Sequence, residues 1–249
     1  MNTTTMIIAG AWCFGAFING LTGMGGALVS LPIISLVVHS KAVIVISLLA
    51  GSVVGLMSFL MYMKYINVRE VLSFWGAALP GIVLGSWTLK IVDLEILQML
   101  LAILITIDII VQLVQEWLGT CMAPRSVMKY LCGFFTGFFN GSLGIGGPIM
   151  AIYASLMCME KNAARGFFCS SVPSQFITVG IAGYNGLISM SVLQTTAWVI
   201  PAVVLGFFLA WPLARRIRQE TFRIALLLLL GVSAVSLFFK SLPYFLQLL

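Results

Sequence analysis

Two copies of one glycine-rich phrase are the residues of this sequence best suited to form a binding site. Residues 19–26 read Asn-Gly-Leu-Thr-Gly-Met-Gly-Gly, and residues 140–147 read Asn-Gly-Ser-Leu-Gly-Ile-Gly-Gly. Each copy lies inside a long uncharged run, 6–38 or 130–159. The glycines oppose an unbroken helix, and a break at membrane depth is tolerated only where protein or a water-filled cavity satisfies the freed backbone groups. Both phrases are therefore candidates for a buried polar site.

The chemistry that such breaks offer is anion binding. In the second copy, Gly146 and Gly147 lead into Pro148 and an apolar run, which predicts a helix with proline in its first turn. In the first copy, Gly25 and Gly26 open the equivalent helix. Free N–H groups and a charge of about +0.5 at each helix N-terminus would face the membrane interior. Two such ends attract a small anion without a buried lysine.

A further polar cluster lies in a later apolar segment. Ser170, Ser171 and Gln175 surround Pro173. Their hydroxyl and amide donors suit an anion pocket beside a proline-bent helix, although serines in membrane helices also bond to their own backbone.

Two charged residues are candidates for coupling or for substrate access. Asp108 lies in an apolar segment, where a charge is unfavourable and indicates function, but the nearby segment end also allows a hydrated or paired carboxylate. Arg165 begins a later segment and suits either anion guidance or a loop charge that fixes topology. The residues predicted to bind the substrate are Asn19, Gly23, Gly25, Gly26, Asn140, Gly144, Gly146, Gly147, Pro148, Ser170, Ser171 and Gln175.

Helix packing is the alternative explanation of the glycines. Gly133, Gly137 and Gly141 form a GxxxG pattern, which allows close approach of helices. Duplication inside a helix break favours a binding site instead. A nucleotide-binding loop is disfavoured because no Lys-Ser or Lys-Thr follows either phrase.

The composition defines an integral membrane protein. Of the 249 residues, 61% are hydrophobic and 8% are charged, which is too little polar material to cover a soluble globule. The net charge of +6 is typical of cytoplasmic loops rather than of nucleic-acid binding. The N-terminus lacks the features of a cleaved signal peptide. The five cysteines form no CxxC pair and no metal-ligand spacing with His39, so packing cysteines are expected, without metal or cofactor.

Charged residues and turns divide the chain into eight apolar segments. Most of them approach the length of about 20 residues that a bilayer-spanning helix needs. The first and fifth are longer and interrupted, which predicts pairs of half-helices. The segments are 6–38, 42–63, 71–89, 96–115, 130–159, 166–183, 187–214 and 224–239.

The eight segments form two copies of a four-segment unit. At a constant offset of 121 positions, residues 14–26 match 135–147 at seven positions. The same offset relates the Pro-x-x-x-Leu-Gly pattern at 80–85 to that at 201–206. Because the same offset relates two separate motifs, the sequence predicts an internal duplication. The repeats are 1–120 and 121–249, within one transmembrane domain.

The basic residues favour a first and a fifth segment that dip into the membrane and return. In that arrangement ten Lys and Arg share one side, and Lys41, Lys90 and Lys240 lie opposite. If the first and fifth segments instead crossed the membrane once each, eight basic residues would lie on one side and five on the other. Because cytoplasmic loops are enriched in Lys and Arg, the ten-to-three arrangement is preferred, and it places both termini outside. It also makes the repeats inverted, as in many secondary transporters.

The two phrases resemble the paired signatures of the sulfite exporter TauE/SafE family of membrane transporters. The resemblance rests on 23–27 with Pro32, on 144–148, on 39–42 and on the Pro-x-x-x-Leu-Gly pattern, and it covers essentially the whole chain. Ala27 stands where the third glycine of the first signature is common. The resemblance implies transport of sulfur-containing anions such as sulfite or organosulfonates.

The sequence therefore predicts an all-α, multi-pass protein of the inner cell membrane that is not an enzyme. Two inverted four-segment repeats with broken or re-entrant helices would export a small anion by alternating access around a midplane site. Its predicted partners are that anion and the lipid bilayer, and the oligomeric state is left open. The alternatives are a membrane-embedded thiol redox enzyme, which cysteine removal would inactivate, and a structural membrane subunit, for which duplicated breaks without a ligand are unexpected.

Overall fold

The computed structural model describes residues 3–38, 40–118 and 126–213, and all regular secondary structure in these ranges is helical. The predicted all-α class is therefore confirmed. The last predicted segment, 224–239, lies outside the described residues. The elements are α1 (Thr3–Thr22), α2 (Gly26–Val37), α3 (Ala42–Tyr62), the 3-10 helix η1 (Met63–Tyr65), α4 (Val68–Ile91), α5 (Leu94–Leu118), α6 (Ser126–Leu143), α7 (Gly147–Leu156), α8 (Lys161–Cys169), α9 (Val172–Tyr184) and α10 (Met190–Leu213).

Several helices have the length and composition of membrane spans. Within the described ranges, four are long and apolar enough to cross a membrane: Thr3–Thr22, Ala42–Tyr65, Val68–Ile91 and Met190–Ala210. The apolar helices α2 and α7 have only 12 and 10 residues. At 1.5 Å per residue they reach about 15 to 18 Å, roughly half of a hydrocarbon core of about 30 Å. Neither of these two helices can span a bilayer alone.

The sixth predicted segment differs from the structure. A single helix was expected over 166–183, but α8 ends at Cys169 and α9 begins at Val172. Pro173 lies in the first turn of α9, where its missing N–H is harmless. In a continuous helix the proline ring would clash with the Cys169 carbonyl and remove its hydrogen bond. The proline therefore divides the segment rather than bending it.

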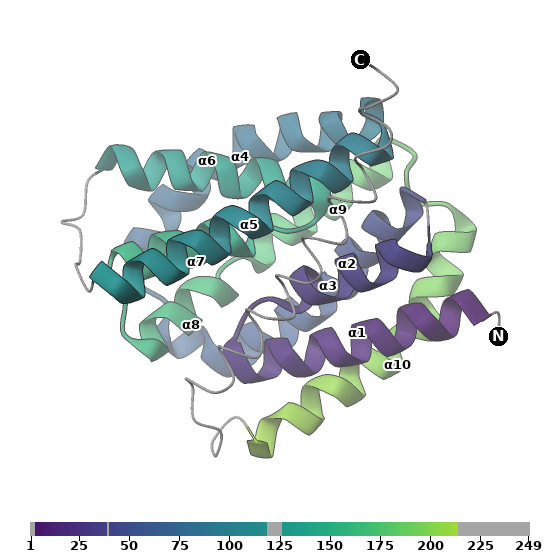
Figure 1. Cartoon of the computed structure of the whole chain (residues 1–249), viewed down its shortest axis with the longest axis horizontal. Coiled ribbons are helices and arrows are strands. Elements are labelled where there is room, and N and C mark those ends of the chain that lie inside the picture. Colours follow the sequence, from purple (N-terminus) through teal and green to yellow (C-terminus); the bar gives the residue numbers. More distant parts are fainter. Residues whose placement is uncertain (1–2, 39, 119–125, 214–249) are drawn as a thin grey trace.

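The two helical hairpins that contain the glycine phrases open toward opposite ends of the bundle (Figure 1). The N-terminal end holds the start of α1, the start of α3 and the end of α4. The opposite end, called here the η1 end, holds η1, the start of α6 and α8. The α1–α2 hairpin opens toward the N-terminal end, and the α6–α7 hairpin opens toward the η1 end.

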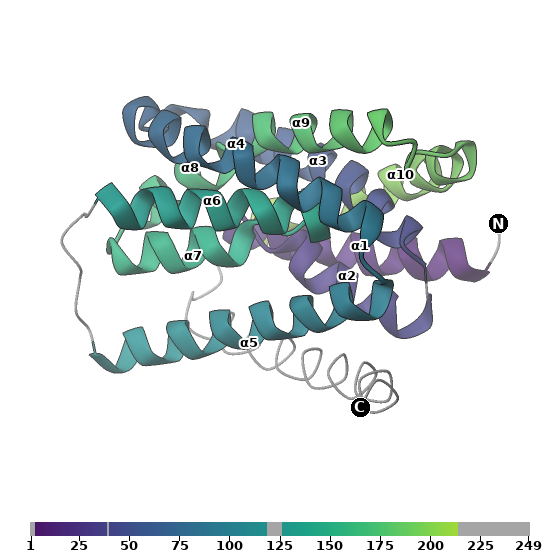
Figure 2. The same cartoon turned by 90° about the horizontal axis from the view of Figure 1, so that it is seen from above.

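The core contains one large and one small apolar cluster. α5 lies along one face of the bundle, next to α7 (Figure 2). Leu97, Leu101 and Ile105 of α5 are buried in the large cluster together with Trp12 of α1. The small cluster packs the rings of α4, α7 and α8 at the η1 end through Phe74, Tyr153 and Phe167.

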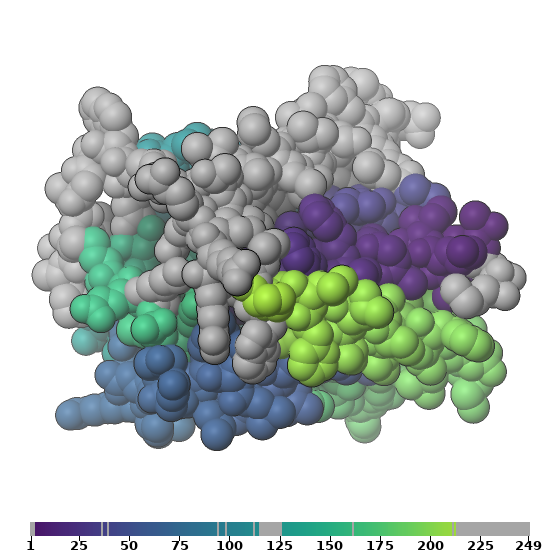
Figure 3. All heavy atoms as spheres, turned by 90° about the horizontal axis from the view of Figure 1, so that it is seen from below, coloured from purple at the N-terminus to yellow at the C-terminus, as the bar shows by residue number. Residues whose placement is uncertain are grey.

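Each half of the chain packs a long helix against the first helix of the other half. α4 lies along α6, and α10 lies along α1, as Figure 3 shows for the second pair. A Cβ atom at Gly85 would overlap the Phe138 carbonyl, and one at Gly206 would overlap the Cys13 carbonyl. The glycine of each Pro-x-x-x-Leu-Gly pattern therefore permits close helix contact. The two halves are intertwined.

Helix packing also explains three glycines of α6. A Cβ atom at any of them would overlap a backbone carbonyl of α4, so side chains there are excluded. The glycines are Gly133, Gly137 and Gly141, facing the carbonyls of Phe74, Ala78 and Ile82 in that order. The GxxxG pattern thus serves contact between helices, whereas the glycines of the breaks have a different environment.

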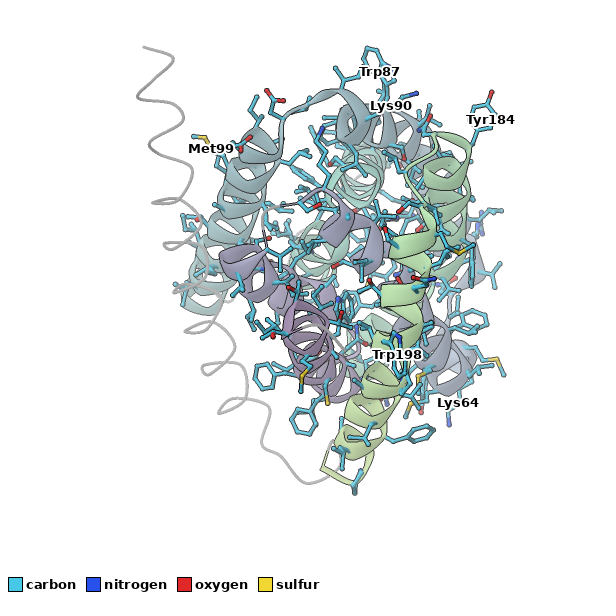
Figure 4. The ribbon with its side chains drawn as sticks, turned by 90° about the vertical axis from the view of Figure 1, so that its right-hand side faces the viewer. Lys64, Trp87, Lys90, Met99, Tyr184 and Trp198 are labelled. Atoms are coloured by element: carbon cyan, nitrogen blue, oxygen red, sulfur yellow. The ribbon has the colours of Figure 1, made fainter. Side chains whose placement is uncertain are left out.

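The outer surface of the bundle carries large aromatic side chains. Seen along the long axis of the bundle, Trp87 and Tyr184 point away from its centre (Figure 4). Their side chains are 62% and 93% exposed, as expected for groups that face lipid or the membrane interface.

Candidate functional site

A cavity of about 80 Å³ lies between the two glycine phrases. Its wall combines both helix breaks with one face of α3 and with parts of α8 and α9. Ten of the residues predicted to bind the substrate line it: Asn19, Gly23, Gly25, Gly26, Asn140, Gly144, Gly146, Gly147, Ser171 and Gln175. The fold therefore brings together the two copies of the phrase, which lie 121 positions apart in sequence.

The first break requires glycine at two positions. Gly23 and Gly25 have φ angles of 89° and 99°, in the left-handed region that side chains disfavour. Gly23 donates its N–H to the Asn19 carbonyl over 2.7 Å, and Gly25 is the N-cap residue of α2. A Cβ atom at Gly25 would meet nothing within 4 Å. Its glycine is thus required by the backbone, while the position itself faces open space.

The second break has the same hydrogen bond from a glycine N–H to the asparagine carbonyl, but its backbone differs from the first at the N-cap glycine. Gly144, with a φ angle of 72°, donates its N–H to the Asn140 carbonyl over 3.0 Å. Gly146, the N-cap residue of α7, has a φ angle of −96° and is not left-handed as Gly25 is. A Cβ atom at Gly146 would lie 3.0 Å from the Thr136 carbonyl oxygen. Glycine is required there for packing against α6.

The asparagine of each phrase makes an equivalent bond to another helix. Asn19 Oδ1 accepts a hydrogen bond from Ser58 Oγ of α3 over 3.0 Å. Asn140 Nδ2 donates to Thr178 Oγ1 of α9 over 3.1 Å. The partners lie 39 and 38 residues after their asparagines, so the two copies of the phrase bond to other helices at similar separations, one through the amide oxygen and one through the amide nitrogen. Each bond engages one end of an amide that has donors and an acceptor.

Gln175 of α9 adds a third amide to the wall. Its Nε2 donates to Ser171 Oγ over 3.2 Å. Its Oε1 is buried with no hydrogen-bond partner among the described residues, and a Cβ atom at Gly55 of α3 would overlap it. The unsatisfied oxygen is an acceptor that a water molecule can satisfy, whereas an anion would need the Nε2 donor of the same amide.

Four of the predicted residues do not line the cavity. Pro148 is buried in the first turn of α7, where the sequence placed it. Ser170 accepts a hydrogen bond from Trp75 Nε1 over 2.9 Å. Asp108 is 1% exposed within α5, and Arg165 lies beside the first break.

The sequence analysis missed the contribution of α3. Ser47, Gly51, Gly55 and Ser58 recur every three or four residues, so one face of α3 lines the cavity. Ser47 also accepts a hydrogen bond from Trp12 Nε1 over 3.3 Å. The helical spacing of small and hydroxyl residues in this segment is the signal that would have indicated the face.

Helix N-termini, rather than charged side chains, are the source of positive potential at the wall. Among the described lining residues none is Asp, Glu, Lys, Arg or His. α2 and α7 both begin at the wall, and each N-terminus contributes about +0.5 of a charge through its free N–H groups. Within the described ranges no group of three or more His, Cys, Asp and Glu is placed to hold a metal ion.

The cysteines differ from one another. Cys13, Cys132 and Cys169 are free thiols, and Cys169 lines the cavity. Cys158 is disulfide-bonded, so the expectation that it serves only for packing was wrong.

Membrane-length helices around a cavity that two copies of one glycine phrase line are typical of membrane transporters. The family model of the sulfite exporter TauE/SafE matches residues 7–237, and the chain belongs to this family. Members of the family are membrane transporters, which confirms the predicted class of multi-pass transport protein. No match was found among curated proteins or among solved structures.

Proposed function

We propose that the protein is a secondary transporter that exports a small sulfur-containing anion, such as sulfite or an organosulfonate, across the inner cell membrane. The observation that carries the proposal is the shared cavity, because both copies of the phrase line one space of about 80 Å³. A water molecule needs roughly 10 to 15 Å³ of such space. The cavity therefore suits a ligand of a few heavy atoms.

Neutral groups would bind this anion. The N–H groups at the starts of α2 and α7 and the amides of Asn19, Asn140 and Gln175 surround the space. A hydrogen bond to a charged group contributes about 1.5 to 3 kcal/mol. Several such bonds, together with the two helix N-termini, would offset the loss of the hydration shell of the anion.

Alternating access would come from two inverted repeats. The hairpins open toward opposite ends (Figure 1), and the basic residues are unevenly divided between these ends. Of the basic residues in the described ranges, two lie at the N-terminal end, Lys41 and Lys90, and five lie at the η1 end, Lys64, Arg69, Lys129, Lys161 and Arg165. This bias supports a cytoplasmic η1 end and an N-terminus outside. Because α1 packs with α10 and α4 with α6, the moving bodies would be these pairs rather than the halves of the sequence.

Calorimetric titration of the purified protein tests the proposal. Sulfite, thiosulfate, methanesulfonate and acetate are compared, and binding of a sulfur-containing anion is expected. Asn140→Ala should weaken it about ten- to a hundredfold, the equivalent of one charge-assisted hydrogen bond. The matched control is Thr195→Ala, which removes a partly exposed hydroxyl that does not line the cavity and that bonds the Ser191 carbonyl of its own helix.

Efflux of the bound anion from proteoliposomes then distinguishes transport from binding alone. The proposal fails if no sulfur-containing anion binds, or if Asn140→Ala and Thr195→Ala bind it equally well. Binding without efflux under any ion gradient would also contradict it.

A further inference from the structure

Arg165 of α8 contacts the first helix break from the η1 end. Its Nη2 donates a hydrogen bond to the Leu21 carbonyl oxygen over 2.8 Å. A Cβ atom at Gly23 would lie 3.0 Å from Arg165 Cγ, so the arginine stem packs directly on this glycine. The guanidinium carbon also lies 5.3 Å from the centroid of the Tyr62 ring, at the end of α3. One partly buried side chain thus joins α8, the α1–α2 break and α3.

This contact closes one boundary of the cavity. Gly23 lines the cavity, and Arg165, which does not, packs on Gly23 from outside. The Leu21 carbonyl belongs to the last turn of α1, where carbonyls lack helical partners and a cation is favourable. The arginine comes from the second half of the chain and the break from the first, so their bond holds the two halves together.

The equivalent position of the other repeat has no such side chain. The residue 121 positions before Arg165 is Ile44. At the second break, a Cβ atom at Gly144 would lie 3.1 Å from Leu48 Cδ2 and 3.8 Å from the Ile44 carbonyl oxygen. The Leu48 side chain therefore packs on the second break, whereas the Arg165 side chain packs on the first. The two ends of the cavity have different chemistry.

We propose that Arg165 is the gate residue of the η1 end, and that an oxyanion opens this gate by replacing the Leu21 carbonyl as hydrogen-bond acceptor. The inference rests on the proposed transport of such an anion. An anionic oxygen binds a guanidinium more strongly than a neutral carbonyl does, and the planar fork binds two oxygens of a sulfonate together. Loss of the bond to Leu21 would free the α1–α2 break to move away from α8.

The accessibility of the cavity tests the gate. Val54 is 1% exposed and lines the cavity, so Val54→Cys is the reporter, in a variant whose five native cysteines are replaced by alanine. A membrane-impermeant thiol reagent is added to sealed vesicles of each orientation. The labelling rate is measured with and without methanesulfonate, which does not react with thiols, and chloride controls for ionic strength.

Arg165→Gln should speed labelling at least tenfold from one side of the membrane and abolish the effect of methanesulfonate. In the Val54→Cys parent, labelling from that side of the membrane should be slow without methanesulfonate and faster when methanesulfonate is added. Arg165→Lys, which keeps the charge and loses the fork, should respond partly. The matched control Ile44→Val should behave like the parent. If Arg165→Gln does not give monodisperse protein, Tyr62→Leu removes the ring beside the guanidinium and should show a smaller effect of the same sign.

The inference is overturned if labelling of Arg165→Gln is as slow as that of the parent and still accelerated by methanesulfonate. It is also overturned if calorimetry shows that methanesulfonate binds while the parent labelling rate stays constant. If no sulfur-containing anion binds the parent protein, the proposed function fails as well, and calorimetry shows this independently of labelling.

Discussion

Gly146, the N-cap residue of α7, and Gly147, its first residue, provide a matched test of packing against ligand binding. A Cβ atom at Gly146 would lie 2.9 Å from Thr136 Cγ2 and 3.0 Å from the Thr136 carbonyl oxygen, closer than carbon atoms normally approach. Overpacking of this kind costs about 1 to 3 kcal/mol. Gly146→Ala should therefore lower the free energy of unfolding by about that amount. Gly146 was predicted to bind the substrate, but a side chain at this position would point to Thr136 of α6.

Gly147→Ala should have the opposite effects. The new methyl group would meet only Met24 Cε, at an ordinary contact distance of 3.9 Å. Alanine is favoured over glycine in a helix by up to about 1 kcal/mol, so stability should be kept or slightly increased. Gly147 and Met24 both line the cavity of about 80 Å³, and the methyl group would reduce its room. Affinity for methanesulfonate should fall about tenfold, which corresponds to about 1.4 kcal/mol.

Thermal unfolding and calorimetric titration measure both quantities on the same preparations. Gly10→Ala is the matched control, because a Cβ atom at this exposed position of α1 would meet nothing within 4 Å. The reasoning is refuted if Gly147→Ala destabilises the protein more than Gly146→Ala does. It is equally refuted if Gly147→Ala binds methanesulfonate as tightly as Gly10→Ala.

Three further predictions concern the site, the topology and the thiols. Asn19→Ala and Asn140→Ala should each weaken anion binding about ten- to a hundredfold, and a double-mutant cycle should show non-additive effects because both amides would contact one ligand; additive losses would indicate separate sites. Single cysteines at positions 41 and 90 should be labelled from outside and those at 64 and 69 from the cytoplasm, whereas labelling of 41 and 64 from one side would contradict the inverted arrangement. Replacing Cys13, Cys132 and Cys169 by alanine should leave efflux intact, and its loss would favour a thiol redox enzyme.

The parts of the site that could be predicted are those that the sequence contains twice. A glycine phrase repeated inside an apolar run predicts a helix break from this one sequence, because left-handed backbone such as that of Gly23 and Gly144 needs glycine. The asparagine that begins each phrase was predicted by the same logic. Their shared position in one cavity follows from the packing of α1 on α10 and of α6 on α4, which joins the two halves of the chain.

Contacts between distant segments could not be predicted. Arg165 and Leu21 are 144 positions apart, and no local pattern shows that an arginine of α8 reaches the end of α1. The cavity-facing side of α3 carries small and hydroxyl residues rather than the charged face that orients a helix in a soluble domain, and it stayed unassigned because this weaker signal was not used. The different roles of Gly25 and Gly146, which occupy matching positions, depend on φ angles that the repeat does not determine.

The pairing of α1 with α10 affects how the protein is made. α1 leaves the ribosome before the other described helices, yet a Cβ atom at its Gly20 would lie 2.7 Å from Ala210 Cβ and 3.1 Å from the Phe207 carbonyl oxygen of α10. Most of the chain must be translated and inserted before α1 meets this partner, so the glycine-lined face of α1 stays open to lipid and to other nascent helices during synthesis. We expect ribosome-bound chains that end before α10 to crosslink to membrane insertion or quality-control factors through the Cys13 to Gly20 face, and to lose these crosslinks once α10 has been inserted.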